Sequence, residues 1–535
     1  MKLRQITWQN YRRLPDGQID VRNHLVLVGP NDSGKSSVLR AIDLCLGVSG
    51  ARLTTLVTDR DFTELSVPLV LQVVLDGIED ADRAAFPDEI STVAGETLTV
   101  AIEAVIEDGD TEQKQVRRWF PDAGHGRSPT RVQLRQFGWA YVPPTRSLFR
   151  ELGSGSTGAI RTLLSSVDLT DDQTAFDEAA DTFQSALLGS AALTTFRTEL
   201  AGALSGALPR TISPDDLKLA AESELLDDPL ASVTVALTDG DYSAPILEQS
   251  DGIRALTVLS LLALSHRTAS IVGVDEPELH LHYTAQRVIA SKLREGHGQR
   301  VLVTHSPAIV GEMDPLDIVT MRDDRRPRQL GTGADIAELE AYTRHWSHNL
   351  IEPLTARRVL LVEGPSDRII CERVGQLIGI DLNRKGVAIF ELSGSGLFAR
   401  AYRRFGPDGF DLPVFGLLDT DARDEWARAL GCRPDEISDS GRFEVCDRDL
   451  EAMYVDLLGV DRTLQLLVAS PAISLSAIRR ACGVDLADLT AEVLAEYCGH
   501  KKRKIRASLA IAAGLDRTEA AALGAVTRIV RAVGT

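Results

Sequence analysis

The segment HLVLVGPNDSGKSSVLRAIDLCLG (His24–Gly47) joins an apolar run, a glycine-rich loop and a helical pattern. His24–Gly29 is rich in Val and Leu, which is typical of a buried strand. The apolar spacing after Ser36 predicts a helix. Between them the pattern G-x-x-x-x-G-K-S is complete, with its defining residues at Gly29, Gly34, Lys35 and Ser36. This order of strand, loop and helix predicts a phosphate-binding loop in an α/β domain.

The loop has the chemistry of a nucleotide site. Its backbone amides converge at a helix N-terminus, where the helix dipole favours anions. Lys35 is expected to contact the β- and γ-phosphates, and Ser36 to ligate Mg²⁺. We expect a nucleoside triphosphate, ATP, to bind along Gly29, Asn31, Gly34, Lys35, Ser36 and Ser37.

Two later segments supply the other groups that an ATPase needs. SIVGVDEPELHLH (Ser270–His282) is an apolar strand that ends in Asp275 and Glu276. Adjacent acids at the end of a buried strand are costly unless they have a role. Asp275 is expected to hold Mg²⁺ and Glu276 to activate the attacking water. In VTHSP (Val303–Pro307), His305 ends the next strand and is expected to sense the γ-phosphate.

A third segment indicates that the ATP site is shared between two chains. In EQSDGIRAL (Glu248–Leu256), Ser250 and Gly252 precede the helix before the Asp-Glu strand. Nucleotide-sandwich ATPases carry a Ser-Gly signature at this place, which contacts the γ-phosphate of the opposite protomer. The alternative is an ordinary N-capped helix start.

The chain length of 535 residues requires more than one domain. Strands and helices alternate through most of the chain, which predicts α/β domains with mostly parallel sheets. The stretch 148–230 has helical, Ala-rich patterns, and a polar segment at Arg322–Asp335 breaks the alternation. We expect an ATPase domain over 1–147 and 231–335, a helical insertion over 148–230, and a second α/β domain with a helical tail over 350–535.

The second domain carries acids at its strand ends. VLLVEGPSDRII places Glu363 after a buried strand and Asp367 in the helical turn that opens near Pro365. LPVFGLLDTD ends a further strand with Asp419 and Asp421, which the strand period puts on one face. Carboxylates this close repel one another unless cations lie between them, and oxygen ligands favour Mg²⁺ or Mn²⁺.

Two further segments complete this prediction. FEVCDRDLEAMY (Phe443–Tyr454) adds Glu451, so the acids have the capacity for two metal ions and for phosphodiester hydrolysis. HKKRKIR (His500–Arg506) offers basic groups for the transition-state charge or for DNA phosphates. The alternative for this run is a solvated helix face.

An ATPase motif set followed by these acids resembles the OLD (overcoming lysogenization defect) family of nucleases. In that family an ABC-type ATPase head precedes a Toprim domain, which has a Rossmann-like α/β fold; the nuclease of the Gabija anti-phage system has a similar layout. The resemblance implies a catalytic and metal-binding core with a C-terminal lysine, at Glu363, Asp367, Asp419, Asp421, Glu451 and either Lys502 or Lys504.

The resemblance also implies partners. The insertion is expected to serve dimerisation, giving a homodimer or higher homo-oligomer through the ATPase region. Expected cofactors are ATP and Mg²⁺ or Mn²⁺, and the expected substrate is DNA. Some members act in defence against phage, alone or with a UvrD-like helicase encoded nearby.

Composition limits these readings. The net charge of −19 argues against wholesale wrapping of nucleic acid and confines DNA contact to local basic patches. An apolar run long enough for a membrane span is missing from the sequence, so no membrane association is expected. The cysteines show no CxxC spacing and are expected to be reduced thiols of a cytoplasmic protein.

Two other functions remain open at this point. A DNA-repair ATPase of the RecF/SMC type would carry a non-cleaving Toprim domain, but SMC-type arms require long heptad repeats, which the sequence lacks. A Toprim topoisomerase or primase is the other alternative, although a topoisomerase needs a nucleophilic tyrosine domain and the tyrosines form no evident motif.

Overall fold

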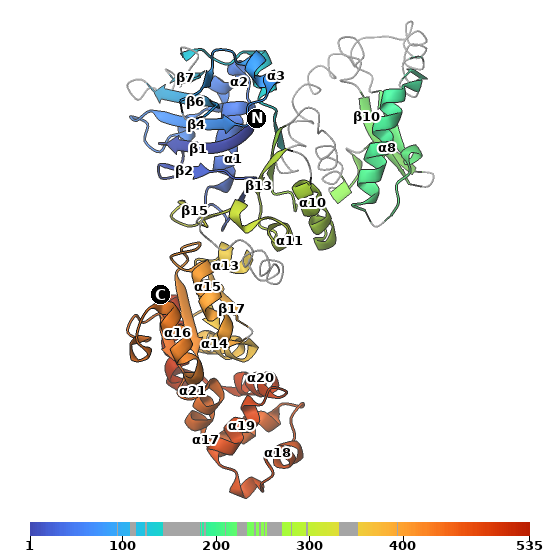
Figure 1. Cartoon of the computed structure of the whole chain (residues 1–535). Helices are drawn as coiled ribbons and strands as arrows, with labels where there is room; N and C mark the ends of the chain where they lie inside the picture. Colours follow the sequence, from blue (N-terminus) through green and yellow to red (C-terminus); the bar gives the residue numbers. More distant parts are fainter. Residues whose placement is uncertain are drawn as a thin grey trace. The chain divides into compact units, whose positions relative to one another are not determined.

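The computed structural model of the chain (Figure 1) contains two compact units, which lie mainly within Met1–Pro327 and Asn349–Thr535. They are called the N-terminal and C-terminal units below. The structure describes residues 1–93, 95–106, 114–122, 126–142, 182, 185–186, 189–208, 210–221, 233–239, 242–245, 248–250, 252–253, 270–279, 281–295, 298–330, 351–392 and 394–535.

A parallel sheet forms the centre of the N-terminal unit. Its strand order is β15-β14-β3-β13-β12-β8. Strands β3, β12 and β13 are buried along their whole length, as expected for a parallel sheet covered on both faces. The strands are β3 (Leu25–Val28), β8 (Trp139–Val142), β12 (Ile271–Asp275), β13 (Gln299–Val303), β14 (Ile318–Met321) and β15 (Pro327–Gln329).

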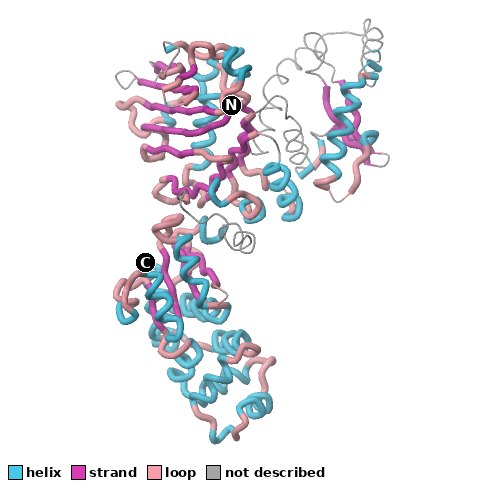
Figure 2. The backbone as a smooth tube through the Cα atoms, viewed as in Figure 1, coloured by secondary structure: helices cyan, strands magenta, loops and turns pink. Residues whose placement is uncertain are grey.

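An antiparallel sheet lies on the other side of helix α1 (Lys35–Leu46), which contacts β4 and β6 of this sheet as well as β12 and β13 of the parallel one. Figure 2 shows its strands in magenta. Burial alternates along β4, so one face packs on the core. The strands are β1 (Lys2–Gln9), β2 (Gly17–Asp20), β4 (Leu69–Asp76), β5 (Ile90–Ser91), β6 (Thr97–Ile106) and β7 (Lys114–Trp119).

Helices link the strands of this unit along the chain. Helix α10 follows β12, and α11 follows β13, as the predicted strand and helix alternation requires. The helices are α2 (Gly50–Leu56), α3 (Asp80–Ala85), α4 (Arg131–Gln136), α10 (Tyr283–Glu295) and α11 (Pro307–Val310).

The range expected to form a helical insertion is only partly described. Helix α8 (Ala191–Ser205) is helical as expected, but β9 (Leu217–Ala221) is a strand. It pairs antiparallel with β10 (Val233–Asp239), which pairs with β11 (Tyr242–Pro245). Leu200, Leu204, Leu217 and Leu237 share a small core of their own. Residues 143–181 lie outside the described residues.

The C-terminal unit is built on a parallel sheet of order β17-β16-β18-β19. Its strands are β16 (Arg358–Val362), β17 (Val387–Glu391), β18 (Val414–Leu418) and β19 (Phe443–Val445). Helices accompany these strands, namely α13 (Ile351–Thr355), α14 (Pro365–Ile378), α15 (Phe398–Phe405) and α16 (Arg423–Leu430). This is the predicted second α/β domain, with the acidic motifs at the carboxyl ends of its strands.

The predicted helical tail follows β19. Helices α17 and α20 pack on each other, and α14 contacts α20, α21 and α22, so the tail and the sheet share one apolar core. The tail helices are α17 (Leu450–Ala469), α18 (Leu475–Cys482), α19 (Ala491–Gly499), α20 (Lys504–Gly514), α21 (Arg517–Ala522) and α22 (Gly524–Gly534).

Two further findings bear on the sequence predictions. None of the helices that the structure describes has both the length and the apolarity of a membrane span. The cysteines all lie among the described residues and are free thiols.

Candidate functional site

The shape of the P-loop depends on its two glycines. Gly29 and Gly34 have φ angles of +150° and +97°, which favour glycine. A Cβ at Gly29 would lie 1.9 Å from the carbonyl oxygen of Met321, and one at Gly34 would lie 2.4 Å from Leu14 Cδ2. The loop therefore closes tightly against its surroundings and leads directly into α1.

Lys35, the first residue of α1, lies over the inner edge of this loop. Its ammonium group donates hydrogen bonds to the carbonyl oxygens of Gly29 (3.1 Å) and Pro30 (2.7 Å). Burial lowers the pKa of Lys35 to about 8, although Glu276 and Asp275 oppose the shift. These hydrogen bonds hold the ammonium group beside the loop, where a phosphate bound by the loop amides would lie.

Ser36 and Asp275 bring the loop and the acid strand together. Ser36 Oγ donates to Asp275 Oδ1 at 3.2 Å, and Asp275 ends the buried strand β12. Burial raises the pKa of Asp275 to about 6, while the Ser36 hydrogen bond lowers it. The hydroxyl and the carboxylate are hard oxygen donors, so this pair fits Mg²⁺.

Glu276 and His305 lie at neighbouring strand ends, as predicted. Glu276 has a φ of +50°, and its N–H donates to the carbonyl oxygen of Val303 at 2.8 Å. Burial lowers the pKa of His305 to about 4, and Lys35 lowers it further. A neutral His305 imidazole near pH 7 follows.

The sequence reasoning missed Glu278. This half-buried carboxylate accepts hydrogen bonds from Thr304 Oγ1 (2.8 Å) and from the backbone N–H of His305. It therefore fixes the segment that carries His305. Glu278 is part of the same DEPEL motif, two residues after Glu276, so its spacing was an available signal.

Arg12 and Asp61 were also missed. Asp61 is 1% exposed and pairs with Arg12 (2.8 Å) and Arg40 (3.2 Å). Arg12 also donates to Ser37 Oγ at 3.2 Å. One buried carboxylate thus ties the β1–β2 connection to the first turns of α1. No sequence motif marks this arrangement.

The remaining predicted nucleotide residues are exposed or partly exposed. Asn31 is exposed in the loop. Ser250 is exposed and accepts a hydrogen bond from the backbone N–H of Ile253 at 3.4 Å, which is the helix-capping arrangement; Gly252 lies between them. Contact of Ser250 and Gly252 with an opposite protomer stays a prediction.

The acids of the C-terminal unit converge at one edge of its sheet. Strands β16 and β18 pair in parallel, so their carboxyl ends adjoin. Among the described residues, Glu363, Asp419 and Asp421 place carboxylate oxygens within 4.8 Å of one another. The backbone N–H of Asp419 donates to Glu363 Oε1 at 3.1 Å.

The sequence predicted that Asp419 and Asp421 lie on one face because they are two residues apart in a strand, and this reason was wrong. Strand β18 ends at Leu418, and Asp421 lies in the 3₁₀ turn η8 (Thr420–Ala422). The backbone N–H of Thr420 donates to the carbonyl oxygen of Arg448 at 2.9 Å, which fixes this turn. Turn geometry, rather than strand alternation, brings the two carboxylates together.

Asp367 and Glu451 border this cluster. Asp367 is buried, and its carboxylate accepts a hydrogen bond from the Gly364 N–H at 2.9 Å, which caps α14. Glu451 is 1% exposed in the first turn of α17. Its Oε2 lies 3.2 Å from Lys504 Nζ, whereas its buried Oε1 has no hydrogen-bond partner within the described part of the chain.

The two candidate lysines differ sharply. Lys504 begins α20 and faces the acids; burial lowers its pKa, but Glu451, Asp367 and Asp419 raise it above the ordinary value. Lys502 is exposed, and its backbone N–H donates to His500 Nδ1 at 3.3 Å. Of the two, the structure brings Lys504 to the acid cluster and not Lys502.

The cluster fits divalent cations. Burial, with Glu363 and Asp367, raises the pKa of Asp419 to about 8, and burial raises the pKa of Glu451 to about 7. Crowded carboxylates destabilise one another's charge unless a cation lies among them. The oxygen-only ligand set and the unpartnered Glu451 Oε1 agree with Mg²⁺ or Mn²⁺.

Known protein families match three parts of the sequence. Residues 1–92 match an AAA ATPase domain, and residues 152–311 match an AAA domain described for the AbiEii toxin of a Type IV toxin–antitoxin system. Residues 354–421 match the TOPRIM domain of overcoming lysogenization defect protein-like proteins. The last match includes Glu363, Asp367, Asp419 and Asp421.

Two curated relatives cover most of the chain. The OLD nuclease of Thermus scotoductus is 24% identical over 422 residues, which span 73% of this chain and 77% of the relative. Endonuclease GajA of Bacillus cereus is 21% identical over 432 residues, which span 74% and 71%. These alignments agree with an ATPase region followed by a Toprim region.

Solved structures resemble parts of the chain. An SMC head bound to the C-terminal winged-helix domain of ScpA covers 63% of this chain and all of its own, with 14% identity and a TM-score of 0.40. The C-terminal region of the Burkholderia pseudomallei OLD protein covers 33% of this chain and 97% of its own, with 20% identity and a TM-score of 0.28.

Proposed function

Because this chain is an ATPase–Toprim protein of the OLD family, we propose that it hydrolyses DNA phosphodiester bonds. The reaction takes place at the cluster of Glu363, Asp419 and Asp421. It depends on divalent metal and is regulated by ATP. The observation that carries the proposal is the approach of these carboxylates within 4.8 Å, with Lys504 paired to the adjoining Glu451. A site with acids and one partly buried cation suits a phosphoryl group that gains charge in the transition state.

Each residue has a separate task in this proposal. Glu363, Asp419 and Asp421 bind Mg²⁺ or Mn²⁺, which when bound activates water and stabilises the leaving oxygen. Asp367 holds the turn after Glu363 through the Gly364 N–H. Lys504 neutralises charge on the phosphate and orients Glu451.

Plasmid cleavage tests this assignment. Metal-stripped full-length protein should nick or linearise supercoiled DNA when Mg²⁺ or Mn²⁺ is added, and the double variant Asp419→Asn/Asp421→Asn should lose this activity. Asp424→Asn, an exposed acid of α16, serves as the matched control. Cleavage by the double variant at the wild-type rate, or no cleavage of any DNA by the wild type, would reject the proposal.

We assign the N-terminal unit to ATP binding, with Lys35, Ser36 and Asp275 at the phosphates and Mg²⁺. Lys35→Ala should remove both ATP binding and any effect of ATP on plasmid cleavage, while it leaves the basal cleavage rate in place. If the Lys35→Ala variant is folded but has lost basal cleavage, Lys35 takes part in DNA cleavage and its assignment to ATP binding alone is rejected.

The proposal extends to assembly and biology. Ser250, which is exposed, and Gly252 would complete the ATP site of a second copy. A non-hydrolysing Glu276→Gln variant should therefore dimerise with ATP, as measured by sedimentation. A role in anti-phage defence is proposed from the family resemblance of the sequence alone. Plaque counts on cells with the wild-type chain or the Asp419→Asn/Asp421→Asn variant, with and without any neighbouring helicase gene, test it.

A further inference from the structure

We propose that a cavity beside the carboxylate cluster holds one unstacked nucleobase of the substrate DNA strand, next to the phosphate that is cut, and that this cavity determines base preference at the cut site. The inference rests on the proposed nuclease function. It adds a recognition site for a base to a centre that otherwise recognises only phosphate.

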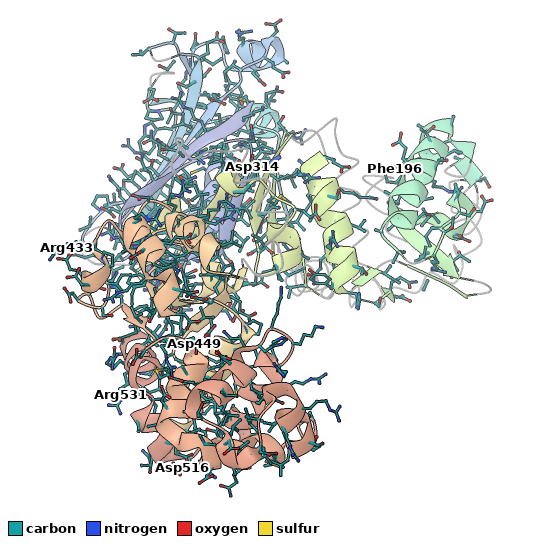
Figure 3. All side chains as sticks on the ribbon, turned by 60° about the horizontal axis from the view of Figure 1, so that its bottom comes forward. Phe196, Asp314, Arg433, Asp449, Asp516 and Arg531 are labelled. Carbon is teal, nitrogen blue, oxygen red and sulfur yellow. The ribbon has the colours of Figure 1, made fainter. Side chains whose placement is uncertain are left out.

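The cavity lies in the C-terminal unit, between the start of α17, helices α18 and α19, and the turn before α20. Its volume is about 620 Å³, which is within the range of small-molecule sites. Asp449, labelled in Figure 3, marks its edge at the N-cap of α17. The side chains with recognition chemistry are Arg448, Glu492, Glu496, Tyr497, His500 and Arg503.

The cavity shares its wall with the acid cluster. Gly499 lines the cavity, and a Cβ there would lie 4.0 Å from Glu451 Oε2. The carbonyl oxygen of Arg448 accepts the N–H of Thr420, the residue between Asp419 and Asp421. Arg503 directly precedes Lys504. A nucleotide whose phosphate contacts the acids can therefore place its base in the cavity.

Arg503 provides a flat surface for a base. Its guanidinium lies over the Tyr497 ring, 4.5 Å from the ring centroid, and Tyr497 is 6% exposed. The ring fixes the guanidinium plane, and such planes stack on unpaired bases in nucleic-acid complexes. Arg503 lines the cavity, so its guanidinium is within reach of a base that enters there.

Two acids on the cavity wall favour a base over a phosphate. Glu492 and Glu496 are exposed on one side of α19 and line the cavity. Two carboxylates repel a phosphate group, but they accept hydrogen bonds from exocyclic amines of bases. Arg448 and Arg503 also line the cavity, so it offers both donors and acceptors, which is the pattern that distinguishes one base from another.

Cut-site sequencing on a randomised DNA library tests the inference. For the wild-type chain with Mn²⁺ or Mg²⁺ we expect one position beside the cut where the most and least favoured bases differ about fivefold or more. Arg503→Lys keeps the charge but removes the plane, and Glu496→Gln removes an acceptor charge. Both should flatten or change this preference, whereas Asp488→Asn, an exposed acid outside the cavity, should not.

Two results would overturn the inference while leaving the nuclease function intact. One is cleavage with equal base frequencies beside the cut, and the other is a preference that both cavity variants retain. If the wild type cuts no DNA, the proposed function itself fails.

If the wild type cuts no DNA, binding of a base in the cavity is measured without cleavage. Single strands with 2-aminopurine at successive positions are mixed with the protein in EDTA, because unstacking of this base raises its fluorescence. An increase for the wild type that Arg503→Lys abolishes supports the base site, and an increase that is absent or unchanged in the variant rejects it.

Discussion

Lys502 and Lys504 are neighbours in one basic run, yet their surroundings differ. Lys504→Met should lower DNA cleavage about 100-fold or more, because the phosphate loses a partly buried cation that faces the acids. Lys502→Met should change it by no more than about threefold, since an exposed charge is screened by solvent. Initial rates of plasmid nicking at saturating Mn²⁺ measure both.

A double variant separates chemistry from stability for Lys504. Removing one partner of a buried ion pair leaves an uncompensated charge and costs about 3–5 kcal/mol. Lys504→Met/Glu451→Gln removes both charges and should regain thermal stability without regaining cleavage. Recovery of cleavage in the double variant would show that Lys504 acts only through folding.

Asp317 gives the N-terminal unit a pH-dependent stability. It is 2% exposed, and burial raises its pKa from 3.8 to about 6. The folded state binds this proton more tightly than the unfolded state, so the stabilising contribution is full below about pH 4 and is lost as the pH rises through 6. Asp317→Asn should therefore raise the free energy of unfolding above pH 7 by up to about 3 kcal/mol relative to wild type. Urea unfolding between pH 4 and 8 checks this, and a gain that is the same at every pH would contradict it.

At the scale of elements, the P-loop turn depends on glycine at position 34. Gly34→Ala places a methyl group 2.4 Å from Leu14 Cδ2 at a φ of +97°. Strain of about 1–3 kcal/mol should weaken binding of a fluorescent ATP analogue about tenfold or more. Gly50→Ala, at the start of α2 with open space around it, is the control and should bind normally. Equal affinities in the two variants would show that the loop tolerates a side chain.

Elements with a strong local pattern could be predicted from the sequence. The strands before Gly29, Asp275, Glu363 and Asp419 are continuous apolar runs, and each forms the buried parallel strand that was expected. Strand β9 was not predicted, because the partner of Leu217–Ala221 among the described strands is β10, which begins only at Val233.

The sites were predictable where chemistry and spacing coincide within a motif. Glu363, Asp419 and Asp421 follow apolar strands, so their meeting at one sheet edge could be foreseen. The choice between Lys502 and Lys504 could not, because it depends on how α20 begins and which side chain faces Glu451. Asp61 and its two arginines were likewise invisible, since their contacts join segments without any motif.

At the scale of the whole molecule, each unit has its own apolar core and its own candidate ligand site. Calorimetry should therefore show two unfolding transitions. A non-hydrolysable ATP analogue with Mg²⁺ should stabilise one transition by about 3 kcal/mol at a hundredfold excess over its Kd, and Mn²⁺ alone should stabilise the other.

Variants assign these transitions. Lys35→Ala should remove the nucleotide shift only, and Asp419→Asn/Asp421→Asn the Mn²⁺ shift only. A single transition that both ligands move equally would show that the units unfold together.

The position of Lys504 along the chain has a consequence for biosynthesis. Glu363, Asp419 and Asp421 emerge from the ribosome well before α20, which carries the cation that pairs with Glu451. A nascent or prematurely terminated chain that ends before α20 holds the acids of the proposed metal site but not that cation. Under the proposed function, the order of translation delays a complete cutting centre until the helical tail has been made, and unfinished chains are expected to leave the genome of the cell that makes them uncut.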